Sequence, residues 1–134
     1  MPAIKKIHHV AIVVNDINQS VAFWRDALGI KLSHIEEVAS QQSKVAFFPF
    51  DHGEIELVQP TTEDSGVAKF LAQKGSGMHH LCFEVDDIEG MIEQLRSKNI
   101  RLINEVPLIL EGRKAAFIHP KSADGVLIEL YQVI

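Results

Sequence analysis

Cysteine is almost absent from this chain of 134 residues, which holds only Cys82. A disulfide framework is therefore excluded, and a reducing compartment fits the composition. Long hydrophobic runs are missing too, because no apolar stretch approaches the roughly 18 residues that a membrane-spanning helix needs. The first residues, MPAIKK, lack the apolar run of a signal peptide. We therefore expect a cytoplasmic protein with no membrane partner.

Positive charge is also scarce. The chain has 13 Lys and Arg residues against 18 Asp and Glu residues, which gives a net charge of −5. This balance argues against a general nucleic-acid binder, because such proteins concentrate positive charge for the phosphates. The hydrophobic share of 46% and the length are typical of one globular domain with a real core.

Two histidine pairs reveal an internal repeat with an offset of 71 residues. HHVAIVVNDI (8–17) matches HHLCFEVDDI (79–88), and VAFFP (45–49) lies opposite AAFIHP (115–120). GEIELVQ (53–59) then matches GVLIELYQ (125–132), so that Glu56 corresponds to Glu129 and Gln59 to Gln132. Two copies are too few for a solenoid, and we expect a duplicated module packed against its twin.

Each copy has the same expected order of elements, one strand, one helix and three strands. Alternating β-branched residues predict the first strand of each copy, and Asp16 and Asp87 are good N-caps for the helices. The predicted strands are 7–14, 30–38, 44–50 and 54–59 in the first copy, and 80–85, 100–106, 114–118 and 126–132 in the second.

The predicted fold class is therefore α+β, with two tandem βαβββ modules forming one curved mixed sheet around a metal-binding cavity. We expect a single domain over residues 1–134. Its parts are module one at about 7–60, a connecting helix at about 61–76, and module two at about 77–134.

Histidines and glutamates at matched positions of the repeat predict a metal site. Glu56 and Glu129 lie within apolar runs, EIELV and VLIELY, where burying an unpaired carboxylate would be prohibitive. If a twofold relates the modules, both glutamates and one histidine of each pair converge. Two imidazoles and two carboxylates suit a divalent ion such as Co²⁺, Zn²⁺, Ni²⁺ or Mn²⁺.

Each of these residues also has a simpler interpretation. A single histidine on a strand is more often a structural residue than a ligand, and an isolated glutamate in a strand usually lies on a solvated face. The match between the two copies favours the metal site. Cys82, inside an apolar strand, is expected to be an inert core thiol. Lys121 and Ser122, in the loop HPKSADG, either meet an anionic substrate or form a turn.

The chain resembles the vicinal oxygen chelate superfamily over nearly its whole length. This superfamily includes glyoxalase I, extradiol dioxygenases and bleomycin-resistance proteins. The segments GMHHLCFEVDDIEGMI, FIHPKSADGVLIELYQ and GEIELVQP are most similar to the methylmalonyl-CoA epimerase family. The resemblance favours His9 and His80 over His8 and His79, which become surface or outer-shell groups. The implied metal ligands are His9, Glu56, His80 and Glu129, with Co²⁺ the expected ion.

The resemblance also implies a chemistry and partners. The substrate would be methylmalonyl-CoA, epimerised at C2 by proton abstraction and return through a metal-stabilised enolate. Glu129 would be both a ligand and an acid/base, and the enzyme would be a homodimer. Some family members have a second glutamate where this chain has Lys44, so Lys44 or Glu56 is the candidate for the second acid/base. Lys121 and Ser122 are the expected substrate-binding residues.

Two other activities within the superfamily compete with this interpretation. A glyoxalase I-like isomerase would use the same four ligands on a glutathione hemithioacetal. Glyoxalases tend to have an Asp-Pro-Asp-Gly turn, whereas this chain has His119, Pro120, Lys121 and Ser122. A metal-free ligand-binding protein of the bleomycin-resistance type would not need both glutamates.

Overall fold

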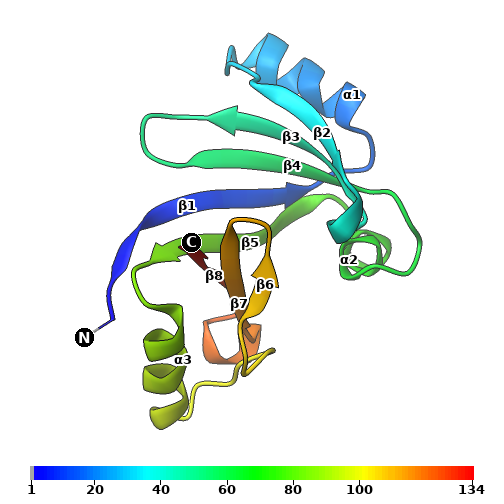
Figure 1. The fold of residues 1–134 in the computed structure, drawn as a ribbon. Coiled ribbons are helices and arrows are strands. Elements are labelled where there is room, and N and C mark those ends of the chain that lie inside the picture. Colours follow the sequence, from blue (N-terminus) through cyan, green and yellow to red (C-terminus); the bar gives the residue numbers. More distant parts are fainter. Residues whose placement is uncertain (1) are drawn as a thin grey trace. The chain divides into compact units, whose positions relative to one another are not determined.

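The computed structural model describes residues 2–134, which separate into two compact units. Unit 1 combines the described residues up to His9 with His80–Ile134, and unit 2 is Val10–His79. Strands β1 (Ile4–Val13) and β5 (Gly77–Val85) run from one unit into the other. Figure 1 shows the elements along the chain. No helix among residues 2–134 is long and apolar enough to cross a membrane.

Unit 2 contains three consecutive antiparallel strands with the first of its two helices packed on one face. The strands are β2 (His34–Val38), β3 (Ser43–Pro49) and β4 (Glu54–Pro60), in the order β2-β3-β4-β1. Helix α1 (Ile17–Val21) continues as a π-helical segment, Ala22–Ala27, while a 3₁₀ turn, Ala39–Gln41, joins β2 to β3 and α2 spans Gly66–Lys74. Asp16 begins α1 as predicted, because its Oδ1 accepts the N–H of Asn18.

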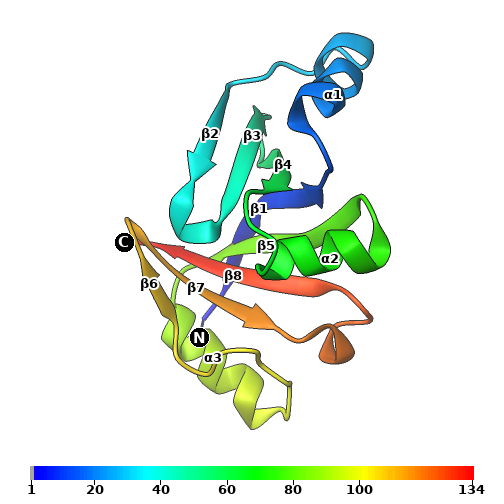
Figure 2. The same cartoon turned by 90° about the vertical axis from the view of Figure 1, so that its right-hand side faces the viewer.

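Unit 1 has the strand order β1-β5-β8-β7-β6. The strand β8 (Leu127–Val133) pairs parallel with β5 and antiparallel with β7 (Arg113–Ile118), and β7 pairs antiparallel with β6 (Leu108–Leu110). Figure 2 shows β8, β7 and β6 side by side. Helix α3 (Ile88–Ser97) begins after Asp87, whose Oδ1 accepts the N–H of Gly90, and a 3₁₀ turn spans Pro120–Ser122.

The repeat is visible in the hydrogen bond that links each helix to a strand of its own unit. In unit 2, the Gln59 Oε1 accepts the N–H of Ile17 at 2.9 Å. In unit 1, the Gln132 Oε1 accepts the N–H of Ile88 at 2.7 Å. Each glutamine therefore satisfies a first-turn N–H that has no partner inside its helix. Gln59 and Gln132, which the repeat predicts to correspond, therefore play the same structural role in their two units.

Each unit has its own core between helix and strands. In unit 1, Ile88, Met91 and Ile92 of α3 pack with Ala116 and Leu130. In unit 2, α1 packs on β3 and β4 through a matching set of side chains: Ile17, Val21, Ala46, Phe48 and Leu57. The 3.6-residue spacing of apolar side chains in the two helices produces these contacts.

The predicted strand at 100–106 is wrong. Only Leu102 forms a bridge, to Ile118, and the strand that pairs with β7 is β6, further along the chain. Asn104 explains the break, because its Oδ1 accepts the N–H of Phe117 at 2.8 Å in place of a backbone carbonyl. The side chain of Asn104 thus takes the place of a neighbouring strand as the hydrogen-bond partner of Phe117 on β7. The predicted strand at 30–38 is also shorter and begins at His34.

Candidate metal centre

Three of the predicted ligands meet within unit 1, each from a different strand. His9 is on β1, His80 on β5 and Glu129 on β8. The Nε2 atoms of the two histidines lie 3.1 Å apart. The Oε1 of Glu129 is 3.1 Å from the His80 Nε2 and 3.4 Å from the His9 Nε2. His9 and Glu129 are buried, and His80 is nearly so.

The register of the strands produces this convergence. Glu129 pairs with Cys82 across the parallel β5–β8 ladder and with Phe117 across the antiparallel β7–β8 ladder. His80 is two residues before Cys82, so the side chains of His80, Cys82 and Glu129 lie on one face of the β5–β8 ladder. The ring of Phe117 stands edge-on to that of His80 with the centroids 6.1 Å apart. Strand alternation thus places a carboxylate and an imidazole on one face.

The three distances fit a bound divalent ion. Atoms that bind one ion at about 2.1 Å lie about 3.0 Å apart at neighbouring octahedral positions and about 3.4 Å apart in a tetrahedron. The observed separations of 3.1, 3.1 and 3.4 Å fall in this range. Two imidazole nitrogens and one carboxylate oxygen are also a donor set that transition metals accept. These residues therefore fit a metal ion.

The electrostatics of Glu129 favour its ionised form. Burial by itself would raise the pKa of this carboxyl, but the hydrogen bonds and charges of His80 and His9 outweigh burial and lower the pKa to about 2. The carboxylate is therefore anionic near neutral pH without any ion present. An anionic oxygen is what a divalent cation needs from a ligand.

The other predicted ligand, Glu56, lies in unit 2. It is half-buried on β4 and pairs with Phe47 on β3, just as Glu129 pairs with Phe117. The two glutamates therefore occupy equivalent positions in their own units. The assignment of Glu56 as a ligand stays a prediction from the repeat.

Lys44 lies on the opposite face of unit 2 from Glu56. It pairs with Gln59, and it alternates with Ala46 and Phe48, which pack against α1. The neighbouring Val45 and Phe47 face the other way, as Glu56 does. The register therefore separates the two candidates for the second acid/base.

The loop residues Lys121 and Ser122 lie on the 3₁₀ turn of unit 1. The Ser122 Oγ accepts the N–H of Arg101, so this hydroxyl has a structural role in the turn. Lys121 is exposed, and its N–H is held by the His119 Nδ1. Burial, with the positive charges of Arg101 and Lys121, lowers the pKa of His119. This local positive potential is favourable for an anionic substrate, and the substrate-binding role stays a prediction.

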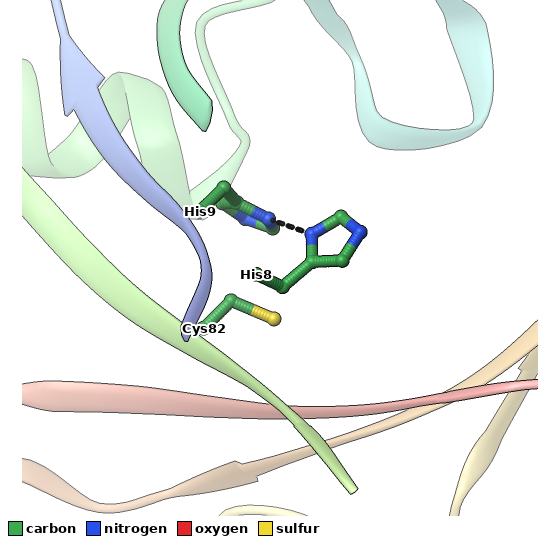
Figure 3. Close-up of side chains that lie close together, drawn as sticks. All are labelled: His8, His9 and Cys82. Atoms are coloured by element: carbon green, nitrogen blue, oxygen red, sulfur yellow. Dashed lines mark hydrogen bonds between the residues drawn. The ribbon is translucent and has the colours of Figure 1, made fainter. Parts of the chain in front are cut away.

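The sequence leaves His8 as a surface or outer-shell group and does not predict its specific contact with His9. The His8 Nδ1 lies 2.8 Å from the Nδ1 of His9, as the dashed line in Figure 3 shows. Strand alternation had placed the two side chains on opposite faces. The only signal in the sequence was the adjacency of the two histidines. Cys82 is fully buried beside them, as expected for a core thiol.

Comparisons with known proteins identify the family and the fold of this chain. The sequence profile of the glyoxalase/bleomycin resistance protein/dioxygenase superfamily matches residues 8–117. The human mitochondrial methylmalonyl-CoA epimerase is 38% identical over 95% of this chain and 73% of its own length. The chain belongs to the methylmalonyl-CoA epimerase family. Members of this family are isomerases, and the chain is an enzyme of the racemase and epimerase class.

Two further members of the epimerase family extend the comparison. The ethylmalonyl-CoA/methylmalonyl-CoA epimerase of Cereibacter sphaeroides is 33% identical over 97% of this chain and 99% of its own. A solved methylmalonyl-CoA epimerase in complex with methylmalonyl-CoA and NH4+ is 30% identical, with a TM-score of 0.87 over 98% of this chain and 96% of that one. The fold of this epimerase-family chain is therefore the vicinal oxygen chelate fold.

Proposed function

We propose that this enzyme epimerises methylmalonyl-CoA at C2. The observation that carries the proposal is the convergence of His9, His80 and Glu129, in a chain whose relatives are epimerases of this substrate. The acyl-CoA partner is supported by the related epimerase with bound methylmalonyl-CoA. The homodimer expected from the resemblance is part of the same proposal.

His9, His80 and Glu129 would hold a divalent ion, with Glu56 as the fourth ligand predicted from the repeat. Co²⁺ is the ion we expect, and Zn²⁺, Ni²⁺ and Mn²⁺ suit the same donors. When bound, such an ion supplies Lewis-acid stabilisation of the negative charge that develops on the substrate oxygens.

Glu129 is the residue we propose to move the proton. Its Oε1 faces both imidazoles, which leaves Oε2 to exchange a proton with C2 on one face of the planar enolate. Inversion requires a second acid/base on the opposite face, for which Lys44 and Glu56 are the candidates from the sequence. A pKa of about 2 makes this carboxylate a weak base. The C2 hydrogen must therefore be unusually acidic, and it is, because it lies between a thioester and a carboxylate. Burial of Glu129 keeps bulk water from competing for the proton.

Deuterium exchange at C2 tests the proposed function. The enzyme with added Co²⁺ is incubated in D₂O with methylmalonyl-CoA, and deuterium uptake and inversion are followed together. We expect both to occur, to fall when EDTA removes the ion, and to return with fresh Co²⁺. Ethylmalonyl-CoA serves as a second substrate, since one methylene is worth only about 1–3 kcal/mol of discrimination.

Exchange absent in protein that demonstrably holds Co²⁺ would contradict the epimerase proposal. Turnover of a glutathione hemithioacetal by the same sample would then favour a glyoxalase-like isomerase. Exchange that persists unchanged in EDTA would contradict the metal requirement and leave the epimerisation itself standing.

Lys44→Met tests whether the lysine takes part in proton transfer. Because Lys44 lies on the α1 face of its sheet, we expect the exchange rate to change by no more than about twofold, as for substitutions away from a site. Single-turnover deuterium uptake from each epimer measures this. Loss of exchange from one epimer alone would show that Lys44 is the missing acid/base after all.

A further inference from the structure

A histidine that binds an ion through Nε2 must carry its proton on Nδ1. In such sites the Nδ1–H is nearly always donated to an acceptor, which fixes both the tautomer and the angle of the ring. His9 directs Nε2 toward His80 and Glu129. The group at its Nδ1 therefore decides how well the ring is held.

The group at the His9 Nδ1 is a neighbouring histidine. The Nδ1 atoms of His8 and His9 are 2.8 Å apart, and the rings meet edge to face at 79° (Figure 3). Two Nδ1 atoms at this distance share one proton, so one ring donates and the other accepts. If His9 presents a bare Nε2 to an ion, it is the donor and His8 is the acceptor.

His8 is itself held by aromatic stacking. Its ring lies on the ring of Tyr131 with the centroids 4.3 Å apart and the planes inclined by 26°. The guanidinium of Arg113 lies 5.3 Å from the centroid of the same tyrosine ring. Tyr131 is on β8, two residues after Glu129, so the strand that supplies the carboxylate also supports His8.

We propose that His8 is a positioning residue for His9. It accepts the His9 Nδ1–H, and its stacking on Tyr131 sets the direction from which that acceptor approaches. The imidazole of His9 is thereby locked with Nε2 toward His80 and Glu129. The hydrogen bond between the two histidines stands without an ion. Only the benefit of fixing the His9 ring, which is better ion binding, rests on the proposed metal site.

A second ion on His8, His9 and Cys82 is the alternative use of these residues. Their donor atoms all lie within 4.8 Å of one another. That arrangement would require a thiolate at a fully buried cysteine. Burial in apolar surroundings disfavours thiolate formation. The contact between the histidines is therefore the favoured arrangement.

Two variants separate the hydrogen bond from packing. His8→Phe keeps an aromatic ring for Tyr131 and removes the acceptor, whereas His8→Asn keeps an acceptor near the Nδ1 position and removes the ring. Loss of an outer-shell partner lowers metal affinity by roughly 10–100-fold. We expect that loss of Co²⁺ affinity in His8→Phe, measured by competition with a chromophoric chelator, and an affinity for His8→Asn nearer the wild type. Thermal unfolding of the metal-free proteins checks that both variants fold.

The tautomer of His9 gives a readout that needs neither metal nor substrate. In metal-free wild-type protein labelled with ¹⁵N, we expect long-range ¹H–¹⁵N spectra to show His9 protonated at Nδ1. His8→Phe should lose this preference, and His8→Asn should keep it. A wild-type protein that binds no Co²⁺ but shows the fixed tautomer would sink the metal proposal and leave the positioning role of His8 intact.

Three results would overturn the positioning role. One is unchanged Co²⁺ affinity and tautomer in His8→Phe. Another is the reverse order, in which His8→Asn loses affinity and His8→Phe keeps it, because packing would then be the function of His8. The third is a second equivalent of Co²⁺ with thiolate-to-cobalt charge-transfer absorption, because His8 would then be a ligand together with Cys82.

Discussion

Replacing Glu129 by glutamine should lower the rate of C2 proton exchange by roughly 10²–10⁴-fold, the usual contribution of a general acid/base. The amide keeps nearly the same shape as the carboxylate, but it cannot accept the C2 proton. It also presents a neutral oxygen to His9 and His80, which now face an anionic one. Deuterium uptake at saturating Co²⁺ isolates the proton-transfer defect from weaker ion binding.

Glu56→Gln is the matched control for this substitution. It makes the same chemical change at the position of unit 2 that is equivalent to Glu129. The amide oxygen of the new glutamine would remain available as a neutral ligand there, as amide oxygens are in other metal sites. We therefore expect the Glu56 variant to keep most of its exchange activity and to bind Co²⁺ somewhat more weakly.

The contrast between the two variants decides the roles. Equal losses in both would mean that the glutamates act alike, either both as ligands or both as the acid/base pair. An intact exchange rate in Glu129→Gln would remove this residue from the proton-transfer step, whatever the state of the metal.

Much of the fold could be predicted because helix caps and repeated motifs are recognisable in the sequence. The histidine pairs and the helix caps repeat at an offset of 71 residues, and the matching glutamines, Gln59 and Gln132, each bond to the helix of their own unit. Both caps are short-range interactions between a carboxylate and nearby N–H groups, so their spacing along the chain is diagnostic. The superfamily and its fold were predicted from the resemblance of three segments, GMHHLCFEVDDIEGMI, FIHPKSADGVLIELYQ and GEIELVQP, and the comparisons confirm both.

The features that could not be predicted from the sequence depend on contacts between distant segments. Asn104 ends a predicted strand because its side chain accepts a hydrogen bond from the Phe117 N–H. The alternation of apolar and polar residues does not indicate that partner. The side on which Lys44 lies depends on its register with Gln59, which periodicity alone does not fix. The approach of His8 to His9 likewise depends on the stacking of His8 on Tyr131, far along the chain.

Protonation of Glu129 should lower the stability of the metal-free protein, and it should do so only at an unusually low pH. The pKa of this carboxyl is about 2 in the folded protein against a usual value of 4.5. Because the folded-state pKa is lowered, the stabilisation is fully present above the higher value and disappears as the pH falls through the lower one. The shift corresponds to a contribution on the order of 3 kcal/mol.

The free energy of unfolding in urea, measured for wild type and Glu129→Gln without metal, tests this. Their difference isolates Glu129 from the other carboxyls that titrate in the same range. We expect the variant to be markedly less stable than wild type at about pH 5 and the gap to shrink at about pH 2.5. A gap of constant size would mean that Glu129 is not held ionised by His9 and His80. The ¹³C resonance of its carboxyl carbon would then titrate near 4.5, the pKa of an ordinary glutamate.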